Sequence, residues 1–390
     1  MLTLKKEDCS GCFACYSICP KKAISMEEDN EGFLYPKIDK NLCINCELCT
    51  KVCPINNKRD DSYIRKSFVA RDTRKDILKL GTSGSVFTSL MEYFLNNNGV
   101  VYGSIVDDDN IVKHIRIDSF DDCRMKKIPG SKYVRSYIGE SFSQVKNDLE
   151  QDKIVLFSGT PCQVSGLKNY IGKDNANLYL VDFVCRGNPS PMFLKKYVDF
   201  QEKKYKSRII EIRFRNKTYG YHSSTMKLSF ENGKTYYGSP RTDIYLKSFF
   251  SDLCSRPSCY DCKHKGIKHN SDLTLFDSWH AKEVASNIID DDYGFTNVIV
   301  QSEKGHRLLS LLNTIELHDS DLEKCISYDG IMLRESVKIP EKRSEFLKSL
   351  NELSVSLDKY VKRYVSISLK DILIEKSKKI YYMRKYRRFK

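Results

Sequence analysis

Two cysteine-rich stretches near the N-terminus decide the fold of the first part of this chain. They are "CSGCFACYSICP", from Cys9 to Pro20, and "CINCELCTKVCP", from Cys43 to Pro54. Both have the spacing C-x2-C-x2-C-x3-C-P, in which three cysteines wrap around one 4Fe–4S cluster and the fourth ligates a second cluster. The predicted ligands are therefore Cys9, Cys12, Cys15 and Cys53 for one cluster, and Cys43, Cys46, Cys49 and Cys19 for the other.

Two other uses of these cysteines compete with iron–sulfur binding. Zinc sites usually combine two C-x2-C pairs, and here a fixed run of four cysteines occurs twice. Disulfides need an oxidising compartment, and the N-terminus has no apolar run followed by a cleavage site for secretion. Residues 1–57 therefore resemble a bacterial two-cluster ferredoxin, with two short strands predicted between the runs, in "AISMEEDNEGFLYPKID" (residues 23–39).

The composition is that of a soluble globular protein. Of the 390 residues, 41% are hydrophobic and 30% are charged, and no stretch approaches the length of about 20 apolar residues that a membrane span needs. We predict a cytoplasmic protein of two or three domains. The net charge of +14 suggests an acidic partner or an anionic membrane surface, and the absence of a nucleic-acid-binding motif argues against nucleic acid.

Strand and helix patterns alternate after a polar linker. Short apolar runs such as "KIVLFSG" (153–159) and "LYLVDFVC" (178–185) predict buried strands, and each is followed by a helical pattern. An Asn-Gly turn inside "TMKLSFENGKTYYG" (225–238) predicts a hairpin. Repeated alternation predicts an α+β protein with a mixed sheet, and residues 338–390 have a helical pattern that ends in a basic tail. That tail is either solvated or a docking element.

A second set of cysteines lies where ligands collect in α/β folds. Cys162 and Cys185 follow predicted buried strands, and Cys259 and Cys262 form a C-x2-C pair. Because ligands bind at the carboxyl ends of parallel strands, these four cysteines are candidates for a third cluster. A four-cysteine zinc site and plain core packing of the single cysteines are the alternatives.

Four motifs around these cysteines carry a family resemblance. They are "SGTPCQ" (158–163), "CRGNPSP" (185–191), "RPSCYDCKHK" (256–265) and "SDLTLFDSWH" (271–280). Behind a two-cluster ferredoxin, this combination resembles the coenzyme F-420 hydrogenase/dehydrogenase beta-subunit family, in its bacterial, polysaccharide-biosynthesis-associated type. The resemblance implies an FAD-binding core with its own 4Fe–4S cluster on Cys162, Cys185, Cys259 and Cys262.

The resemblance also implies flavin-contacting segments. One is the turn "GTSGSVFTSL" (81–90), for which a plain helix cap by Thr82 or Ser83 is the simpler explanation, and another is "PGSKYVRSYIG" (129–139). Core packing is the alternative for Trp279. The implied cofactor-binding residues are Ser83, Gly84, Ser85, Thr88, Ser131, Lys132, Tyr133, Gly159, Thr160, Asp277 and Trp279.

On this basis we divide the chain into five parts. Residues 1–57 form the ferredoxin domain, 58–66 a linker, 67–150 and 151–337 the two parts of the flavin-binding core, and 338–390 the helical basic tail. The expected function is that of an iron–sulfur flavoprotein oxidoreductase. It would relay electrons between the clusters and FAD to reduce or oxidise a small organic substrate, in surface-polysaccharide metabolism for example.

The alternative function is that of a non-catalytic electron-transfer subunit serving a partner enzyme. Either role requires an external electron donor or acceptor protein. The basic C-terminus adds the option of a peripheral contact with the membrane. No catalytic acid is assigned, although His222 and His280 are candidates on the grounds that histidine titrates near neutrality.

Overall fold

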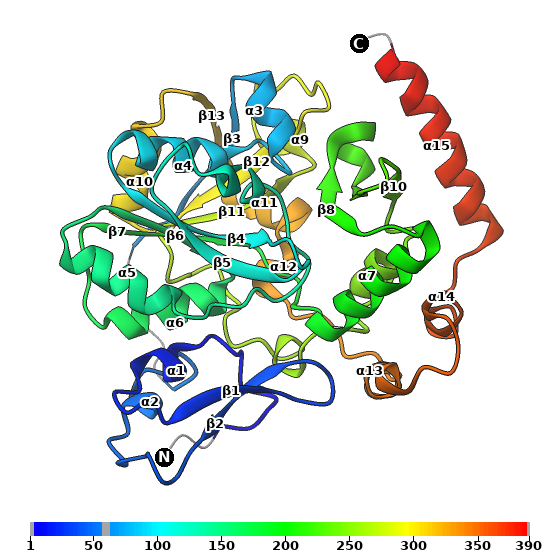
Figure 1. The fold of residues 1–390 in the computed structure, drawn as a ribbon. Helices are drawn as coiled ribbons and strands as arrows, with labels where there is room; N and C mark the ends of the chain where they lie inside the picture. Colours follow the sequence, from blue (N-terminus) through cyan, green and yellow to red (C-terminus); the bar gives the residue numbers. More distant parts are fainter. Residues whose placement is uncertain (1–3, 57–62, 388–390) are drawn as a thin grey trace.

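The computed structural model describes residues 4–56 and 63–387 of the chain, which form three packed parts (Figure 1). A small cysteine-rich unit at the N-terminus lies below an eight-stranded sheet that has helices on both faces. A three-stranded sheet with its own helices lies beside them. Most of the predicted linker, residues 58–62, lies outside the described residues.

The N-terminal unit contains the two predicted strands as an antiparallel pair in which Ile24 faces Ile38. Each cysteine run turns into a short helix immediately after a residue with left-handed backbone, Phe13 (φ 71°) in the first run and Glu47 (φ 59°) in the second. These two residues hold the same place in the two runs, so the repeat in the sequence is also a repeat in the structure. The elements are α1 (Ala14–Ile18), β1 (Ile24–Glu28), β2 (Leu34–Ile38) and α2 (Leu48–Lys51).

The large sheet is mixed, with strand order β13-β3-β12-β11-β7-β6-β4-β5. Its four central strands, β11, β7, β6 and β4, run parallel, and the pairs toward both edges are antiparallel. The strands are β3 (Lys66–Asp72), β4 (Val100–Val106), β5 (Val112–Ile117), β6 (Val155–Gly159), β7 (Leu178–Phe183), β11 (Leu273–Ser278), β12 (Phe295–Val300) and β13 (Ile315–Ser320). No sequence pattern marks β13, because "IELHDS" is a polar, partly exposed edge strand.

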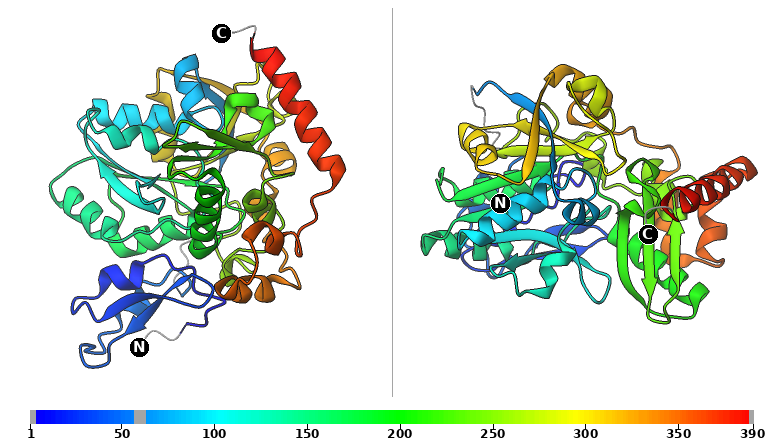
Figure 2. Two further views of the ribbon diagram at one scale, coloured as in Figure 1. Left: turned by 45° about the vertical axis from the view of Figure 1, so that its right-hand side comes forward. Right: turned by 90° about the horizontal axis from the view of Figure 1, so that it is seen from above.

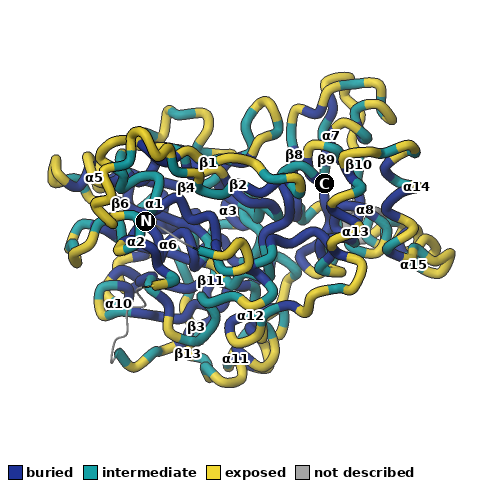
Figure 3. The backbone as a smooth tube through the Cα atoms, turned by 90° about the horizontal axis from the view of Figure 1, so that it is seen from below, coloured by how far each residue is buried: buried dark blue, intermediate teal, exposed yellow. Residues whose placement is uncertain are grey.

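Helices cover both faces of this sheet, and the core is buried between these layers (Figure 3). One face packs against α4 (Val86–Asn96) and α10 (Glu303–Ser310), with α3 (Lys75–Leu80) nearby. The other face packs against α5 (Ser141–Glu150), α6 (Pro161–Ile171), α9 (Ala281–Val284), α11 (Leu322–Asp329) and α12 (Ile331–Arg334). The N-terminal unit docks on α6, where Gly166 leaves room for Cys12.

The third part has a separate hydrophobic core. It joins the sheet β10-β9-β8, including the predicted hairpin, to helices before and after it in the sequence (Figure 2). Its elements are α7 (Pro191–Tyr205), β8 (Ile209–Asn216), β9 (Thr225–Phe230), β10 (Thr235–Gly238), α8 (Ile244–Phe250), α13 (Arg343–Ser349), α14 (Leu357–Val361) and α15 (Leu369–Arg387). The structure confirms the predicted fold class. The domain boundaries stay predictions, and strands from both sides of residue 150 share the large sheet.

The helical tail is present as α15, which lies along the three-stranded sheet (Figure 2). Lys379 Nζ donates to the Tyr237 carbonyl oxygen at 2.7 Å, and Glu375 accepts from the Ser239 hydroxyl. Apolar side chains remain outside, since Leu369 is 80% exposed and Leu373 66%. Among the helices of residues 4–56 and 63–387, none is both long and apolar enough to cross a bilayer.

Candidate electron-transfer site

The eight ferredoxin-type cysteines divide into the two predicted groups. Cys9, Cys12, Cys15 and Cys53 line one cavity, which we call the first cluster pocket. Cys19, Cys43, Cys46 and Cys49 line another, the second cluster pocket. The fourth cysteine of each run therefore lies with the first three of the other run, as the spacing predicts. Cys46 is exposed, whereas Cys9, Cys12 and Cys53 are buried, so the second pocket is the more accessible one.

The second set of cysteines follows the parallel strands. Cys162 lies in the first turn of α6, just after β6 ends at Gly159, and Cys185 lies two residues after β7. A capping box fixes the start of α6: the Thr160 amide donates to the Gln163 side chain at 3.0 Å. Because β6 and β7 are parallel neighbours, both cysteines reach the same edge of the sheet.

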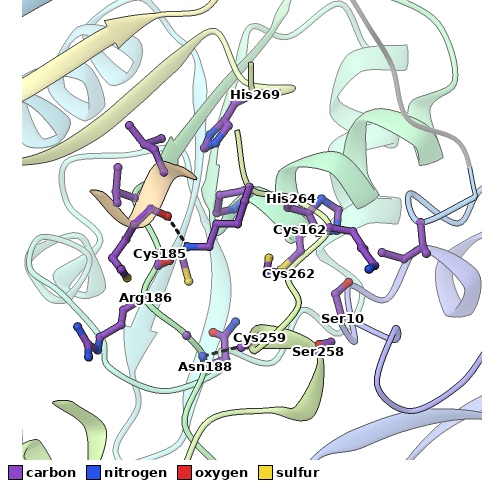
Figure 4. A pocket seen from close by; sticks show the side chains of 18 of the residues that line it. Ser10, Cys162, Cys185, Arg186, Asn188, Ser258, Cys259, Cys262, His264 and His269 are labelled. Carbon is purple, nitrogen blue, oxygen red and sulfur yellow. Dashed lines mark hydrogen bonds between the residues drawn. The ribbon is translucent and has the colours of Figure 1, made fainter. Parts of the chain in front are cut away.

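These two cysteines meet Cys259 and Cys262 around one cavity of about 570 Å³, counting its open part, which we call the third cluster pocket. Figure 4 shows the four side chains around it, brought in by three separate segments of the chain. Among the described residues, no three His, Cys, Asp or Glu side chains converge closely enough for a single metal ion. The four sulfurs instead surround a space, which suits a larger group.

The electrostatics of the third cluster pocket set one cysteine apart. Burial raises the pKa of the Cys185 and Cys259 thiols, and it raises the pKa of Cys262 to about 12. Burial also raises the pKa of Cys162, but the Arg135 guanidinium and the Thr160 hydroxyl outweigh it and bring the net value below the ordinary one. For the other three thiols, burial outweighs the nearby charges of Lys265, Arg256 and Arg135, and the irons of a cluster would supply the positive charge that favours their thiolates.

A histidine faces the same pocket. The His269 ring is buried and its Nδ1 lies 2.8 Å from Asp182, while its Nε2 is buried and has no hydrogen-bond partner. A buried nitrogen without a hydrogen-bond partner is destabilising unless a bound non-protein group contacts it. Four cysteines and this nitrogen therefore fit a sulfur-rich cluster. Cys254, which lies close to Cys259 in the sequence, is instead in the core of the third part, away from this pocket.

The predicted flavin-contacting segments gather around a large cleft of about 1860 Å³, counting its open part. Of the eleven predicted cofactor-binding residues, all but Gly84 line it. Gly84 is packed against β3 and β12 instead, and its amide donates to Thr296 Oγ1 at 2.9 Å. The cleft and the third cluster pocket share a wall, which consists of Val184, Cys185, Arg186, Gly187, Asn188 and Met332.

One wall of the cleft joins the two predicted flavin-contacting segments. The Ser131 amide donates to Thr82 Oγ1 at 2.8 Å, which ties residues 129–139 to the turn before α4. Between them, the half-buried Lys132 ammonium donates to the Gly130 carbonyl at 3.0 Å. Burial lowers the pKa of Lys132 to about 7, so this side chain has either charge state near neutrality.

Trp279 and Asp277 belong to a cluster that the sequence did not indicate. The Trp279 ring stacks on Tyr221 at 4.3 Å between centroids, and the Arg215 guanidinium lies 4.6 Å from the Trp279 ring. Arg215 also pairs with Asp277. Neither Arg215 nor Tyr221 stands in a motif, because they come from β8 and the loop after it, in the third part. Their only sequence signal is an aromatic and basic stretch.

The two histidines considered as acids each contact a carboxylate. His222 Nε2 lies 2.9 Å from Asp290 in a small cavity beside Trp279. His280 Nδ1 lies 2.8 Å from Asp329, which itself lines the cleft. Neither histidine lines the cleft itself, so the geometry assigns neither one to the chemistry.

The similarity to known proteins matches this geometry. Residues 152–323 match the family model for the C terminus of the coenzyme F420 hydrogenase/dehydrogenase beta subunit. Residues 8–57 match the 4Fe-4S dicluster domain. The first match contains the four cysteines of the third cluster pocket, and the second contains the eight cysteines of the other two.

Individual relatives give the same picture. A coenzyme F420-dependent sulfite reductase of Methanocaldococcus jannaschii is 24% identical over 367 residues, which is 86% of this chain and 51% of the relative. The chain thus spans about half the length of that protein. The pyruvate synthase subunit PorD of the same organism is 42% identical over 53 residues, covering 14% of this chain and 57% of the PorD chain.

A solved structure is also similar. A chain of the F420-reducing [NiFe] hydrogenase complex from Methanosarcina barkeri has 19% identity and a TM-score of 0.44, covering 75% of this chain and 93% of that one. By sequence, this chain is similar to a coenzyme F420-dependent sulfite reductase and to the C terminus of the coenzyme F420 hydrogenase/dehydrogenase beta subunit, and its first residues are similar to a 4Fe-4S dicluster domain.

Proposed function

We propose that this chain relays electrons between an external redox protein and a flavin, FAD, bound in the cleft. The observation that carries this is the order of the cavities. The first and third cluster pockets share Ser10 and Ile55, and the third pocket shares a wall with the cleft. With the second pocket exposed at the far end, the pockets form a path from the surface to the cleft.

The chain's residues would divide the work along this path. The cysteines of the three pockets hold 4Fe–4S clusters, which exchange single electrons, and a flavin can take up electrons singly and release them in pairs. Lys132, Ser131 and the turn before α4 hold the anionic part of the flavin. Trp279, braced by Tyr221 and Arg215, lines the cleft and orients the ring system.

The substrate in this proposal is a small organic molecule. Similarity to a coenzyme F420-dependent sulfite reductase favours coenzyme F420, and the proposed link to surface-polysaccharide metabolism leads instead to a sugar-linked acceptor. The relatives found are archaeal, which supports the first choice. A cytoplasmic location, with the exposed apolar face of α15 resting on an anionic membrane, completes the proposal.

The test uses the full chain, purified without oxygen. Released flavin is quantified, and the chain is then reduced stepwise while the flavin absorbance and the cluster signals in electron paramagnetic resonance are followed. We expect about one FAD per chain, reduced in equilibrium with the clusters. Oxidation of that flavin by F420, but not by a sugar-linked acceptor, would identify the substrate class.

The competing function is a pure electron-transfer subunit. The similarity of the N-terminal unit to a pyruvate synthase subunit supports it. Full cluster content without any bound flavin, both as purified and after incubation with FAD, would reject the flavoenzyme and favour the subunit.

A further inference from the structure

Two buried arginines lie between the first and third cluster pockets. Arg135 donates from one terminal nitrogen to Cys162 Sγ at 3.2 Å and from the other to the Gly11 carbonyl oxygen at 2.6 Å. Arg256 donates from Nε to the Cys9 carbonyl oxygen at 2.7 Å, and a terminal nitrogen lies 3.7 Å from Cys9 Sγ. Both guanidiniums therefore touch the first cysteine run, and Arg135 also touches the third set.

Among the described residues, no carboxylate pairs with either of these two charges. In the part of the chain that the structure describes, the polar contacts of both guanidiniums go to cysteine sulfur or backbone carbonyl oxygen. Arg256 is 1% exposed and Arg135 9%, and Arg135 Nε is buried without a hydrogen-bond partner. A buried charge without a counter-charge is unfavourable. The thiolates and clusters of the two pockets would supply the missing negative charge.

The charge of Arg135 lies directly against the third set, because its guanidinium donates to Cys162 Sγ at 3.2 Å. Arginine stays protonated at every working pH, so this positive charge is constant. A fixed positive charge in a buried site favours the more negative, reduced state of a neighbouring cluster.

We propose that Arg135 and Arg256 are positioning residues that raise the reduction potentials of the first and third clusters together. An electron that leaves the first cluster oxidises it by one electron and reduces the third by one, and no proton moves because the guanidiniums keep their charge. Since Arg135 touches both sites, the two potentials stay matched only while the N-terminal unit is docked. This inference rests on the third cluster of the proposed function.

The experiment measures the potential of each cluster in the full chain, by redox titration followed with electron paramagnetic resonance. Arg256→Gln should lower the reduction equilibrium constant of the first cluster about tenfold, which is about 59 mV for one electron. Arg135→Gln should do the same for the third cluster. The second cluster is an internal reference, because among the described residues the polar contacts of both arginines go to the first cysteine run, to Cys162 and to the Leu34 carbonyl oxygen but not to the cysteines of the second pocket, and its potential should not move.

The outcomes separate charge from packing. Gln variants that keep all their iron and unchanged potentials would overturn the proposal. If the Gln variants lose iron, Arg135→Lys and Arg256→Lys decide the question. Cluster potentials close to those of the wild type would support a charge effect. A potential that falls by about as much as predicted for the Gln variants would refute the charge effect. A wild-type chain with iron for only two clusters would refute the third cluster, and the Arg256 experiment on the first cluster would still be decisive.

Discussion

A largely buried ion pair helps to dock the N-terminal unit, and its removal gives a sharp prediction. Arg343, at the start of α13, forms a two-pronged pair with Glu31, with N–O distances of 2.9 and 2.6 Å. The same guanidinium also donates to the Ser255 carbonyl oxygen at 3.1 and 2.9 Å. The Arg343 side chain is 6% exposed and that of Glu31 13%, so solvent cannot replace these bonds.

Arg343→Met should therefore be strongly destabilising. It leaves the Glu31 carboxylate buried and unpaired and removes both bonds to Ser255, and breaking a buried pair in this way costs about 3–5 kcal/mol. The matched control is Arg334→Met, because Arg334 pairs with Glu323 at the surface, with side chains 42% and 66% exposed. A surface pair contributes about 0–1 kcal/mol.

The assay is anaerobic denaturant unfolding of the full chain, with the cluster absorbance as the probe of the N-terminal unit. The double variant Glu31→Gln/Arg343→Met should be less destabilised than the sum of its single variants, because no unpaired charge remains. The reasoning would be refuted if Arg343→Met and Arg334→Met lowered the free energy of unfolding by the same small amount.

Three further predictions follow from the site. Cys185→Ser should lower iron from about twelve to about eight atoms per chain by chemical analysis, whereas Cys254→Ser, in the separate core, should leave it unchanged. Gly166→Ala should lower the free energy of unfolding by up to about 2 kcal/mol and reduce the iron bound in the first cluster pocket. The new methyl group would meet Cys12 Cβ at 2.9 Å, and the overpacking cost of about 1–3 kcal/mol outweighs the gain in helix propensity of about 1 kcal/mol. A stabilised variant with full iron would contradict this. The pKa of Lys132 is about 7 in the folded chain and 10.5 ordinarily, so between these pH values the unfolded chain binds more protons and the free energy of unfolding rises with pH. Urea unfolding at pH 7 and 9.5 should show this rise in the wild type and a smaller rise in Lys132→Met. An equal rise in both proteins would argue against the prediction.

The parts that the sequence predicted best are those that local spacing controls. The cysteine runs fix which four residues share a pocket, because each run has only one way to wrap and to exchange its fourth ligand. The strands before Cys162 and Cys185 were evident because most of their residues are apolar and buried.

The remainder depends on contacts between distant segments. Nothing local to Arg135, Arg256 or Arg343 shows that each reaches the N-terminal unit, since their partners lie 124, 247 and 312 residues away along the chain. The same holds for Arg215 and Tyr221 at the cleft. Gly84 illustrates the reverse case, because a motif resemblance placed it at the cofactor and the structure packs it against two strands.

The most direct test of the relay is the amount of iron, sulfide and flavin in the anaerobically purified chain. Three four-iron clusters and one flavin predict about twelve irons, about twelve sulfides and about one FAD per polypeptide. About eight irons and no flavin would contradict the account, because only the N-terminal unit would then carry electrons.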